Sequence, residues 1–337
     1  MIKVAAFTDH KITPSRRFRV EQLKRPLLKH GIKIQEYLAY PDNFNKRPNW
    51  AVERIFIKLL TMPHRLNRAK TADIAIVQRN LFGKFYTFES FVPNPKLLDI
   101  DDAVWLNQAK NYSFKIAKHF DGVIAGNKNI AKHFEKYGVR TWIVPTAVDT
   151  QRFRPILSKK QKEEIIVGWM GTKDNLYVLR KVERPIKNLM KKYKDVKLLI
   201  CSDSRPQFND IPDSRYLYIP WSSKIEVDVL NMIDIGIMPL DDTEWNRHKC
   251  SYKMLLYMAV GKPVVVSPIG MNNEILNQGS VGFGPRSESE WFDSLQWLYL
   301  HRKEASEMGQ HGRLIVEKNY STEIIASLIS KIINEIV

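Results

Sequence analysis

The sequence DIGIMPL, Asp234–Leu240, is an apolar run that ends at a proline, and it predicts a buried strand. A polar loop follows, and the segment RHKCSYKMLLYMAVG, Arg247–Gly261, then predicts a helix that its last glycine closes. Pro263 opens the next predicted strand, Pro263–Val266. Strand, helix and strand in this order form the repeating unit of a parallel α/β sheet.

The same alternation runs through almost the whole chain, so the predicted fold class is α/β. In the first half, strands are predicted at Ile2–Thr8, Lys33–Ala39, Ile74–Gln78, Lys96–Ile100, Gly122–Ala125 and Trp142–Val144, with helices near Arg17–Lys29, Trp50–Met62, Tyr112–Lys118 and Asn129–Lys136. In the second half, strands are predicted at Ile165–Met170, Val196–Cys201, Tyr216–Ile219, Ile235–Met238, Pro263–Val266 and Val281–Phe283, with helices at Leu176–Lys192, Ile225–Met232, Ser251–Val260 and Glu288–His301. The tail from Glu304 is helical, with a break at 319–321.

Two doubly wound domains are expected, because a chain of 337 residues with 44% hydrophobic content is longer than a domain with a single hydrophobic core usually is. The polar stretch Asp149–Glu164 is interpreted as a linker. The predicted domains are therefore 1–155 and 156–320, and the C-terminal helix, 321–337, could pack back onto the first. A ligand is expected at the carboxyl ends of the strands, in a cleft that the domains face.

The overall charge of +17 favours anionic partners: polyanions, anionic lipid surfaces or phosphorylated substrates. Cys201 and Cys250 lie far apart without metal-ligand spacing, so neither a disulfide framework nor a zinc site is expected. No secretory leader and no membrane-spanning run is recognised. We therefore expect a cytoplasmic protein, soluble or peripheral at the inner face of the cell membrane.

A cluster of cations marks the start of the predicted helix in Arg247–Gly261. Lys249 and Lys253 are four residues apart, so they are expected to share one helical face, with Arg247 and His248 beside them. Cations at the positive end of a helix dipole are disfavoured by about 0.3–1 kcal/mol unless an anion is bound there. The cluster therefore predicts a diphosphate site, and the alternative is a solvated basic face.

These segments, with the continuation Lys262–Leu276, resemble the donor-binding region of family 4 retaining glycosyltransferases. Weaker resemblance extends over nearly the whole chain, at residues 15–19, 99–103, 144–149 and 168–172. The resemblance implies a GT-B fold, a nucleotide-diphosphate sugar donor such as a UDP, GDP or dTDP sugar, retention of anomeric configuration, and no metal or other cofactor.

One departure from the family pattern concerns two glutamates that many members carry eight residues apart. This chain has His248 and Leu256 at those places, and it resembles a branch that uses two lysines, Lys249 and Lys253, on the phosphates. Glu274 matches the family's acidic residue after the glycine turn. Asn272 and Asn273 beside it could present amides to the donor, or the segment could be an ordinary capped helix start.

Two further segments are candidate phosphate contacts. Gly171 and Thr172 end the first strand of the second domain, where glycine permits close backbone approach, although Thr172 or Asp174 could simply cap a helix. In the first domain, Ser15, Arg16 and Arg19 follow the first strand and are candidates for the acceptor side or for a phosphate; one or two of these arginines could merely decorate the helix. 

Carboxylates at the end of another strand are candidates for catalysis or acceptor binding. Asp101 and Asp102 follow Asp99 at the end of the Lys96–Ile100 strand, and a carboxylate there could take a proton from the acceptor hydroxyl. The alternative is a structural turn. His10, after the first strand, is a weaker candidate base.

The segment 50–70 combines an apolar stripe with basic residues. Val52, Ile55, Phe56, Leu59 and Leu60 recur at helical spacing. The basic residues of the segment include Arg54, Lys58, Arg65, Arg68 and Lys70. Such a helix could rest on an anionic membrane, and the alternative is core packing with a solvated basic face.

The predicted function is therefore metal-independent, retaining transfer of a sugar from a nucleotide sugar to a hydroxyl acceptor, in cell-envelope glycan biosynthesis. The acceptor would be lipid-linked or a polysaccharide or other glycoconjugate. A nicotinamide-dependent or nucleotide-sugar-modifying enzyme is an alternative, but no Gly-x-Gly-x-x-Gly follows a predicted strand. A basic nucleic-acid-binding protein is another; no nucleic acid is expected, because many aromatic residues fall within predicted helices and strands.

Overall fold

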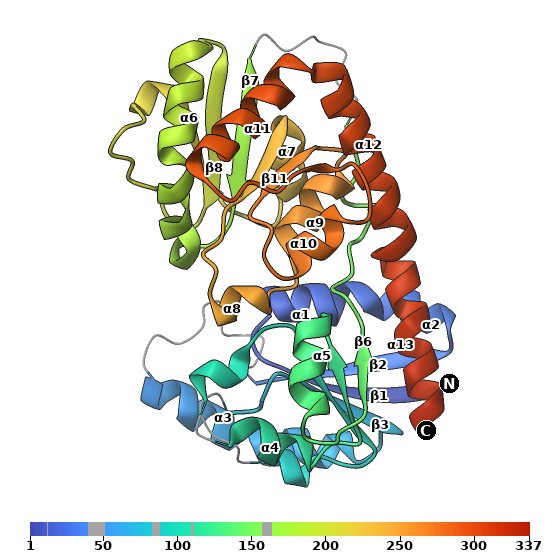
Figure 1. Ribbon diagram of the computed structural model, residues 1–337. Helices are drawn as coiled ribbons and strands as arrows, with labels where there is room; N and C mark the ends of the chain where they lie inside the picture. The colour runs from blue at the N-terminus through green and yellow to red at the C-terminus, as the bar shows by residue number, and fades with distance from the viewer. Residues whose placement is uncertain (12, 40–50, 83–87, 109–110, 157–163) are drawn as a thin grey trace. The chain divides into compact units, whose positions relative to one another are not determined.

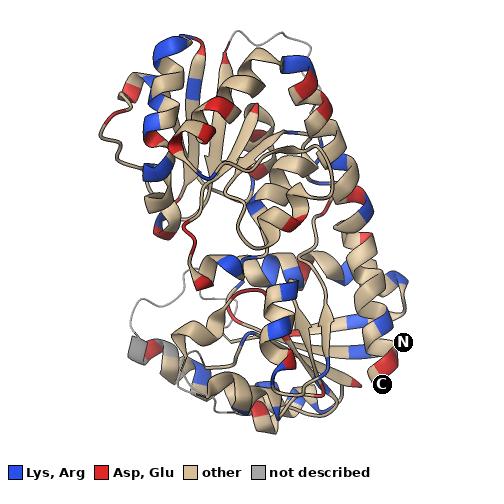
Figure 2. Cartoon of the chain, viewed as in Figure 1, with Lys and Arg blue, Asp and Glu red and all other residues tan. Residues whose placement is uncertain are grey.

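A computed structural model describes residues 1–337 except 12, 40–50, 83–87, 109–110 and 157–163, and except the side chains of 51, 52 and 54. The chain divides into two compact units. Unit 1 comprises Met1–Ala147, His248–Cys250 and Tyr320–Val337, and unit 2 comprises Val148–Arg247 and Ser251–Asn319. Helices that carry Lys and Arg are found in both units (Figure 2).

Unit 1 is built on a six-stranded parallel sheet in the order β2-β1-β3-β4-β5-β6 (Figure 1). The strands are β1 (Ile2–Thr8), β2 (Ile32–Leu38), β3 (Ile74–Gln78), β4 (Lys96–Ile100), β5 (Gly122–Ala125) and β6 (Thr141–Ile143). β1, β3, β4 and β5 have the predicted bounds, because each is a short apolar run between polar turns. Every residue of β3 and β4 is buried without alternation, which is the pattern of a strand covered on both faces of its sheet.

The helices of unit 1 are α1 (Pro14–Arg19), α2 (Lys24–Lys29), α3 (Ala51–Ala69), α4 (Tyr112–Ala117), α5 (Lys128–Glu135) and α13 (Thr322–Ile336), with short 3₁₀ turns η1 (Glu21–Leu23), η2 (Glu89–Phe91) and η3 (Val104–Asn107). The C-terminal helix α13 belongs to this unit's core. Its side chains Ile325 and Ile329 pack in one buried cluster with Val4 of β1 and Leu27 of α2. Ser321 caps α13 by accepting a hydrogen bond from the backbone N–H of Ile324.

Helix α3 differs from its prediction in length and in the face it buries. It continues past the predicted end at Met62 and through Pro63 to Ala69. Its basic side chains Lys58 and Arg65 are buried, whereas Phe56 and Leu60 of the apolar stripe are exposed. The interpretation as a core face with a solvated basic side is therefore wrong: the buried face of this helix combines Lys58 and Arg65 with Met62 and Ala69, and the predicted stripe lies on another face. Trp50 and the side chains of Val52 and Arg54 lie outside the described residues.

Unit 2 has a second six-stranded parallel sheet, in the order β12-β11-β10-β7-β8-β9. The strands are β7 (Ile165–Met170), β8 (Val196–Ser202), β9 (Tyr216–Pro220), β10 (Ile235–Met238), β11 (Val264–Val266) and β12 (Gly282–Phe283). β7 and β10 have the predicted bounds, and the other four agree within a residue at each end. The opening sequence, Asp234–Leu240, thus contains the central strand β10 beside β7.

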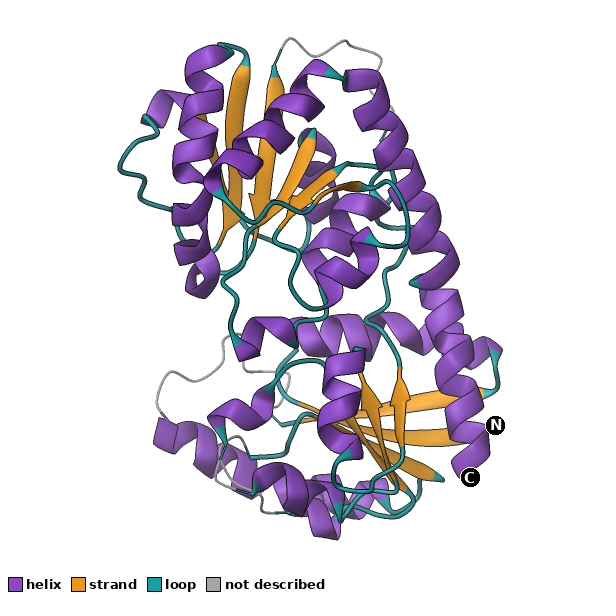
Figure 3. Ribbon diagram, in the orientation of Figure 1, coloured by secondary structure: helices purple, strands orange, loops and turns teal. Residues whose placement is uncertain are grey.

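Helices cover both faces of this second sheet (Figure 3). They are α6 (Arg180–Lys192), α7 (Glu226–Met232), α8 (Glu244–Arg247), α9 (Tyr252–Ala259), α10 (Met271–Leu276), α11 (Glu288–Leu300) and α12 (Arg302–Asn319), with 3₁₀ turns η4 (Lys173–Leu179) and η5 (Asp213–Arg215). On one face, Val167 and Trp169 of β7 pack with Ile186 of α6 and Leu295 of α11. The opposite face packs against α9.

Glycines allow α9 to lie close to the sheet. A Cβ on Gly236 of β10 would overlap the ring of Tyr257, so a larger residue would push the helix away. The Tyr257 hydroxyl accepts a 3.0 Å hydrogen bond from the backbone N–H of Met170 at the end of β7. Gly261, at φ +72°, ends the helix as predicted. The first turn of α9 is thereby fixed at the carboxyl end of β7.

Two further differences come from local backbone geometry. The predicted helix Arg17–Lys29 is three short pieces, α1, η1 and α2, because Val20 leaves helical geometry. The stretch interpreted as a linker contains Phe153, which is fully buried in unit 2 and whose carbonyl accepts a hydrogen bond from Arg313. No helix in the described part of the chain is long and apolar enough to cross a bilayer.

Candidate active site

The carboxyl end of the unit 1 sheet carries a buried ion pair. Asp99 is the penultimate residue of β4, and Arg19 at the end of α1 contacts it. Nε of Arg19 lies 2.9 Å from both carboxylate oxygens, and Nη2 lies 2.5 Å from Oδ1. The two side chains are 3% and 7% exposed. Nη1 of Arg19 also donates to the carbonyl of Val144 at 3.0 Å. Arg19 thus joins α1, β4 and the segment after β6.

The next two carboxylates share a second arginine. Nε of Arg79 lies 2.6 Å from Oδ1 of Asp101, and its Nη2 lies 3.0 Å from Oδ2 of Asp102. Arg79 follows β3 and has φ +61°, a left-handed conformation that a non-glycine residue adopts rarely. Strain of this kind is characteristic of functional positions.

The two carboxyls that Arg79 binds differ in acidity. Burial opposes ionisation of Asp101, but the Arg79 guanidinium outweighs it and lowers the Asp101 pKa. Burial, together with the adjacent Asp101 charge, raises the pKa of Asp102 to about 6, while Arg79 and Lys249 act in the opposite sense. Asp102 is therefore the carboxyl whose protonation changes near neutral pH.

A three-residue segment from the middle of the chain completes this group. His248–Cys250 belongs to unit 1. Asn127, at the start of α5, donates to the His248 carbonyl at 2.7 Å, and Sγ of Cys250 donates to the Asp101 carbonyl at 3.1 Å. Lys249, between them, is close enough to Asp102 for their charges to interact. Burial lowers the pKa of Lys249, and Asp102 opposes that shift.

The aromatic ring of His248 has its own partner in unit 1. It meets the indole of Trp105 edge to face, with ring centroids 5.0 Å apart, and His133 stacks on the same indole at 3.8 Å. Burial lowers the pKa of His133 to about 4, so its ring is neutral at pH 7. A neutral histidine can stack on Trp105 without losing the solvation of a charge. The pair His133 and Trp105 thus forms a platform for His248.

The expectation that Lys249 and Lys253 share one helical face is wrong. Helix α9 begins at Tyr252, and Ser251 before it is left-handed, with φ +51° and ψ +26°. The buried Cys250 and the left-handed Ser251 separate the two lysines, because the chain passes from unit 1 to unit 2 between them. Lys253 lies at the second position of α9, as expected of the first turn, and Lys249 precedes the helix by three residues.

Lys253 forms the corresponding cluster in unit 2. Its Nζ lies 4.5 Å from the ring centroid of Trp169, a cation–π distance. A Cβ on Gly171 would lie 3.0 Å from the same Nζ and 2.5 Å from the Trp169 ring, so the glycine makes room for the pair. Thr172 is exposed, and its Oγ1 accepts from Asn175 at 2.9 Å. Lys253, Gly171 and Trp169 thus meet at the carboxyl end of β7.

The other predicted donor residues lie around α10. Arg247 is exposed and paired with Asp242 at 2.6 Å, and its carbonyl lies where a Cβ on Gly270 would go. Asn273 is exposed and Glu274 half-buried. Asn272 is fully buried and donates its amide to the Ser267 carbonyl at 3.0 Å, so it supports the turn before α10. Their contacts to a donor stay predictions.

The residues predicted after β1 are mostly occupied by protein contacts. Arg16 binds Glu36 through Nε at 2.6 Å and Glu21 through Nη2 at 2.6 Å. Ser15 and His10 are buried, and the His10 carbonyl accepts from Thr13. A phosphate role for Arg16 or Arg19 would require these guanidiniums to share their carboxylate partners, and it stays a prediction, as does the role of His10.

Sequence reasoning missed Arg79, Trp169 and Asn127. Arg79 comes directly after the correctly predicted strand β3, and Asn127 comes two residues after β5, at the same end of the sheet as Asp101. That position was an available signal. Trp169 gave none, because an aromatic residue inside a buried strand ordinarily belongs to the core. The described residues contain no group of three or more His, Cys, Asp or Glu that could hold a metal ion.

Comparisons with known proteins agree on the fold. Residues 162–301 match the family model described as Glycosyl transferases group 1, and no curated protein matches the chain. A glycosyltransferase from Rickettsia africae ESF-5 is similar with a TM-score of 0.74 at 13% identity, over 100% of this chain and 98% of that one. Anabaena HepE in complex with UDP and glucose has a TM-score of 0.71 at 11% identity, over 99% and 100%.

A third similar structure is described as trehalose-6-phosphate from E. coli bound with UDP-2-fluoro glucose, with a TM-score of 0.68 at 11% identity, over 99% of both chains. At such identities the structural likeness shows the fold alone, and the family model matches residues 162–301 only. The chain therefore has the GT-B fold, with two Rossmann-like domains, and its residues 162–301 are similar to the glycosyl transferases of group 1.

Proposed function

We propose that this enzyme transfers a sugar, with retention of anomeric configuration, from a nucleotide-diphosphate sugar to a hydroxyl group of a lipid-linked, polysaccharide or other glycoconjugate acceptor. The observation that carries the proposal is the cluster of Lys253, Gly171 and Trp169, where an ammonium group lies at the first turn of α9 beside an open glycine backbone. Similar structures that hold UDP, UDP with glucose and UDP-2-fluoro glucose support a nucleotide-sugar donor.

The chemistry of this cluster suits a departing diphosphate. Negative charge grows on the phosphate as the glycosidic bond to the sugar breaks, and a fixed ammonium stabilises that charge more in the transition state than in the bound substrate. Backbone N–H groups of the first turn of α9 add to the same field. Lys253 would carry the leaving-group charge, and Lys249 would add to it. Arg247, Thr172, Asn273 and Glu274 are proposed donor contacts around it.

Asp102 is the residue of unit 1 that best suits the acceptor. With a pKa of about 6, its carboxyl is mostly ionised at neutral pH and can accept a hydrogen bond from a hydroxyl. For the retaining step, the hypothesis is attack by the acceptor on the face that the diphosphate leaves, with a phosphate oxygen taking the acceptor proton. Asp101, tied to Arg79, would position Asp102. This reaction uses no metal, and its setting is the cytoplasm, in cell-envelope glycan synthesis.

The first experiment measures binding of donors to the purified chain. UDP, GDP and dTDP sugars are compared by thermal shift, because a ligand that binds only the folded state raises the melting temperature. The best binder is then titrated by calorimetry into the wild type and Lys253→Ala. Loss of one charge-assisted contact should cost about 1.5–3 kcal/mol, or about 10- to 150-fold in affinity.

Lys303→Ala is the matched control, because Lys303 is an exposed lysine on α12 of the same unit. It should bind the donor like the wild type. The proposal fails if no nucleotide sugar binds, or if Lys253→Ala binds as tightly as the control. The anomeric configuration of the product, read by NMR, tests retention separately.

A further inference from the structure

Helix α3 is attached to unit 1 through a face that carries polar side chains beside the buried Met62. Nζ of Lys58 lies 3.0 Å from Oδ1 of Asp9, just after β1. Arg65 donates through Nη2 to the Tyr37 carbonyl at 2.9 Å and to the Thr8 carbonyl at 3.3 Å. The Thr61 hydroxyl donates to the Ala39 carbonyl at 3.1 Å. These contacts, all at the carboxyl ends of β1 and β2, fix the rotation of the helix about its axis.

That rotation turns the apolar stripe outward. Ile55, Phe56, Leu59 and Leu60 are between 43% and 64% exposed, although they recur at the spacing of a single helical face. A core-facing helix would bury such side chains. Here the exposed stripe is the consequence of the buried Lys58 and Arg65, since both faces of one helix cannot point inward together.

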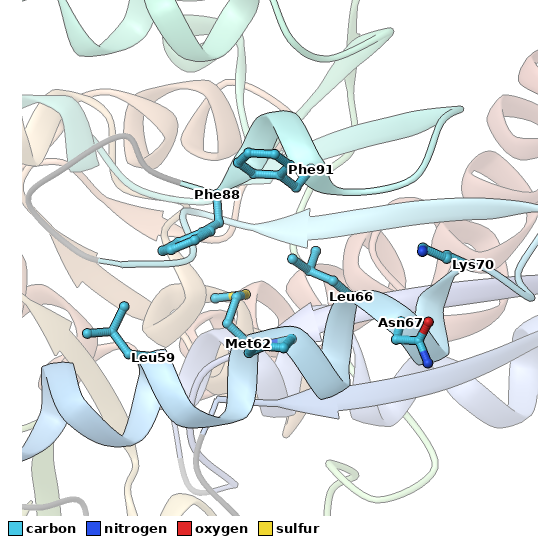
Figure 4. Close-up of a pocket in the computed structure, with 8 residues that line it drawn as sticks. Leu59, Met62, Leu66, Asn67, Lys70, Phe88 and Phe91 are labelled. Carbon is cyan, nitrogen blue, oxygen red and sulfur yellow. The ribbon is translucent and has the colours of Figure 1, made fainter.

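The stripe continues into a groove between α3 and η2. The groove has a volume of about 400 Å³, and its lining is largely apolar. Figure 4 shows Leu66 of α3 pointing toward Phe91 of η2, with Lys70 near one end. Phe91 is itself 68% exposed. The described stripe, the groove and Phe91 form one surface, here called the α3 face. A soluble protein rarely leaves such a continuous apolar surface without a partner.

Charge distinguishes between the partners that could cover the α3 face. The chain has a net charge of +17, so a second copy would be repelled and an anionic surface attracted. Arg68 and Lys70 are exposed at the end of α3, and Glu53 is the single acidic residue in its sequence. An apolar face with cations at its border matches the acyl and headgroup layers of an anionic bilayer.

We propose that the α3 face docks on the surface of an anionic phospholipid bilayer, with the side chains of Phe56 and Leu60 entering the acyl layer. The contact is interfacial, because α3 lies along the surface of unit 1 and is anchored by Lys58 and Arg65. Docking is independent of donor binding, because none of the proposed donor contacts belongs to the α3 face. It would bring the edge of the sheet at Asp9 to the membrane, where a lipid-linked acceptor is found.

Sedimentation with sucrose-loaded vesicles tests the proposal. The full chain is mixed with vesicles of phosphatidylcholine and phosphatidylglycerol, or of phosphatidylcholine alone, and the bound fraction is measured against lipid concentration. The wild type should bind the anionic vesicles and bind less as salt is added. The double variant Phe56→Ser/Leu60→Ser should bind at least about tenfold more weakly, because it loses apolar area in the acyl layer.

The matched control is Leu314→Ser, because Leu314 is 62% exposed on α12 of unit 2 and lies outside the α3 face. It should bind the vesicles like the wild type. All variants change exposed side chains, so their melting temperatures and their affinities for the nucleotide sugar should equal the wild-type values. Loss of sugar binding by the double variant alone would count against the separation of docking from donor binding.

Three results would overturn the proposal. The wild type could fail to bind anionic vesicles, or the double variant could bind them as tightly as Leu314→Ser does. Alternatively, sedimentation velocity could show a wild-type dimer that the double variant abolishes, which would assign the α3 face to a second copy of the chain. None of these results would bear on donor binding, so the proposed glycosyl transfer would stand or fall separately.

Discussion

Removal of one member of the Arg19–Asp99 pair should destabilise unit 1 strongly. In Arg19→Met, the Asp99 carboxylate would stay buried without the guanidinium that now contacts both of its oxygens. Breaking a buried ion pair from one side costs about 3–5 kcal/mol, because the remaining charge keeps its desolvation penalty and loses its partner. The Val144 carbonyl would also lose the donor that now lies at 3.0 Å. We expect a loss of unfolding free energy within that range.

The double variant Arg19→Met/Asp99→Leu separates this account from simple loss of packing. Replacement of both charges by apolar groups leaves no uncompensated ion, so the double variant should be more stable than Arg19→Met. Lower pH should also rescue Arg19→Met. Burial raises the pKa of Asp99 even with Arg19 present. A folded-state pKa above the unfolded value means that the folded form binds more protons, so stability rises as the pH falls.

Urea unfolding at several pH values, followed by circular dichroism, supplies the free energies, and hydrogen exchange at the β4 amides assigns the change to unit 1. The reasoning would be refuted by an Arg19→Met loss under about 1 kcal/mol, the size of an exposed pair. A double variant less stable than the single variant would refute it as well.

Two other predictions concern the reaction. Burial raises the pKa of Asp102 to about 6, so this carboxyl is ionised above that pH and kcat/KM of the wild type should rise through pH 6. Asp102→Asn should remove this pH-dependent rise. A rise that persists in the variant would exclude Asp102 as its source. Trp169→Leu should weaken binding of the nucleotide sugar by about 2- to 30-fold, because a cation–π contact contributes about 0.5–2 kcal/mol. If calorimetry finds equal affinity in a folded variant, Trp169 does not position Lys253.

The fold could be predicted from the sequence because parallel strands that are buried on both faces have short, continuous apolar sequences. β7 and β10 had the right bounds for that reason, and so did most strands of unit 1. Helix boundaries were less predictable where the backbone alone decides them. Val20 breaks the first helical stretch without a proline or glycine to signal it, and α3 passes through Pro63.

The orientation of α3 could not be read from its periodicity. The spacing of Ile55, Phe56 and Leu60 identifies a face but not the direction in which the face points. That direction depends on Lys58 and Arg65, whose partners are backbone carbonyls and Asp9 of distant strands. Such pairings are visible only after the strands are placed.

The candidate site was predicted in outline and missed in its geometry. The sequence located Lys253 in the first turn of a helix and Asp102 at a strand end, and both lie there. It did not reveal that Cys250 is buried against Asp101 or that Ser251 adopts a left-handed conformation. These two residues separate Lys249 from Lys253, and neither a cysteine nor a serine in the sequence predicts such a geometry.

The place of α13 in the buried cluster of unit 1 has a consequence for the order of folding during synthesis. Ile325, Ile329 and Ile333 complete a core that begins with Val4, so the first domain to leave the ribosome cannot finish folding until Tyr320–Val337 has been made. Unit 2 is contiguous apart from three residues and can fold earlier. Unit 2 of the nascent chain would thus fold before unit 1 is complete. A ribosome that stalls before Tyr320 would carry a folded unit 2 and an incompletely folded unit 1.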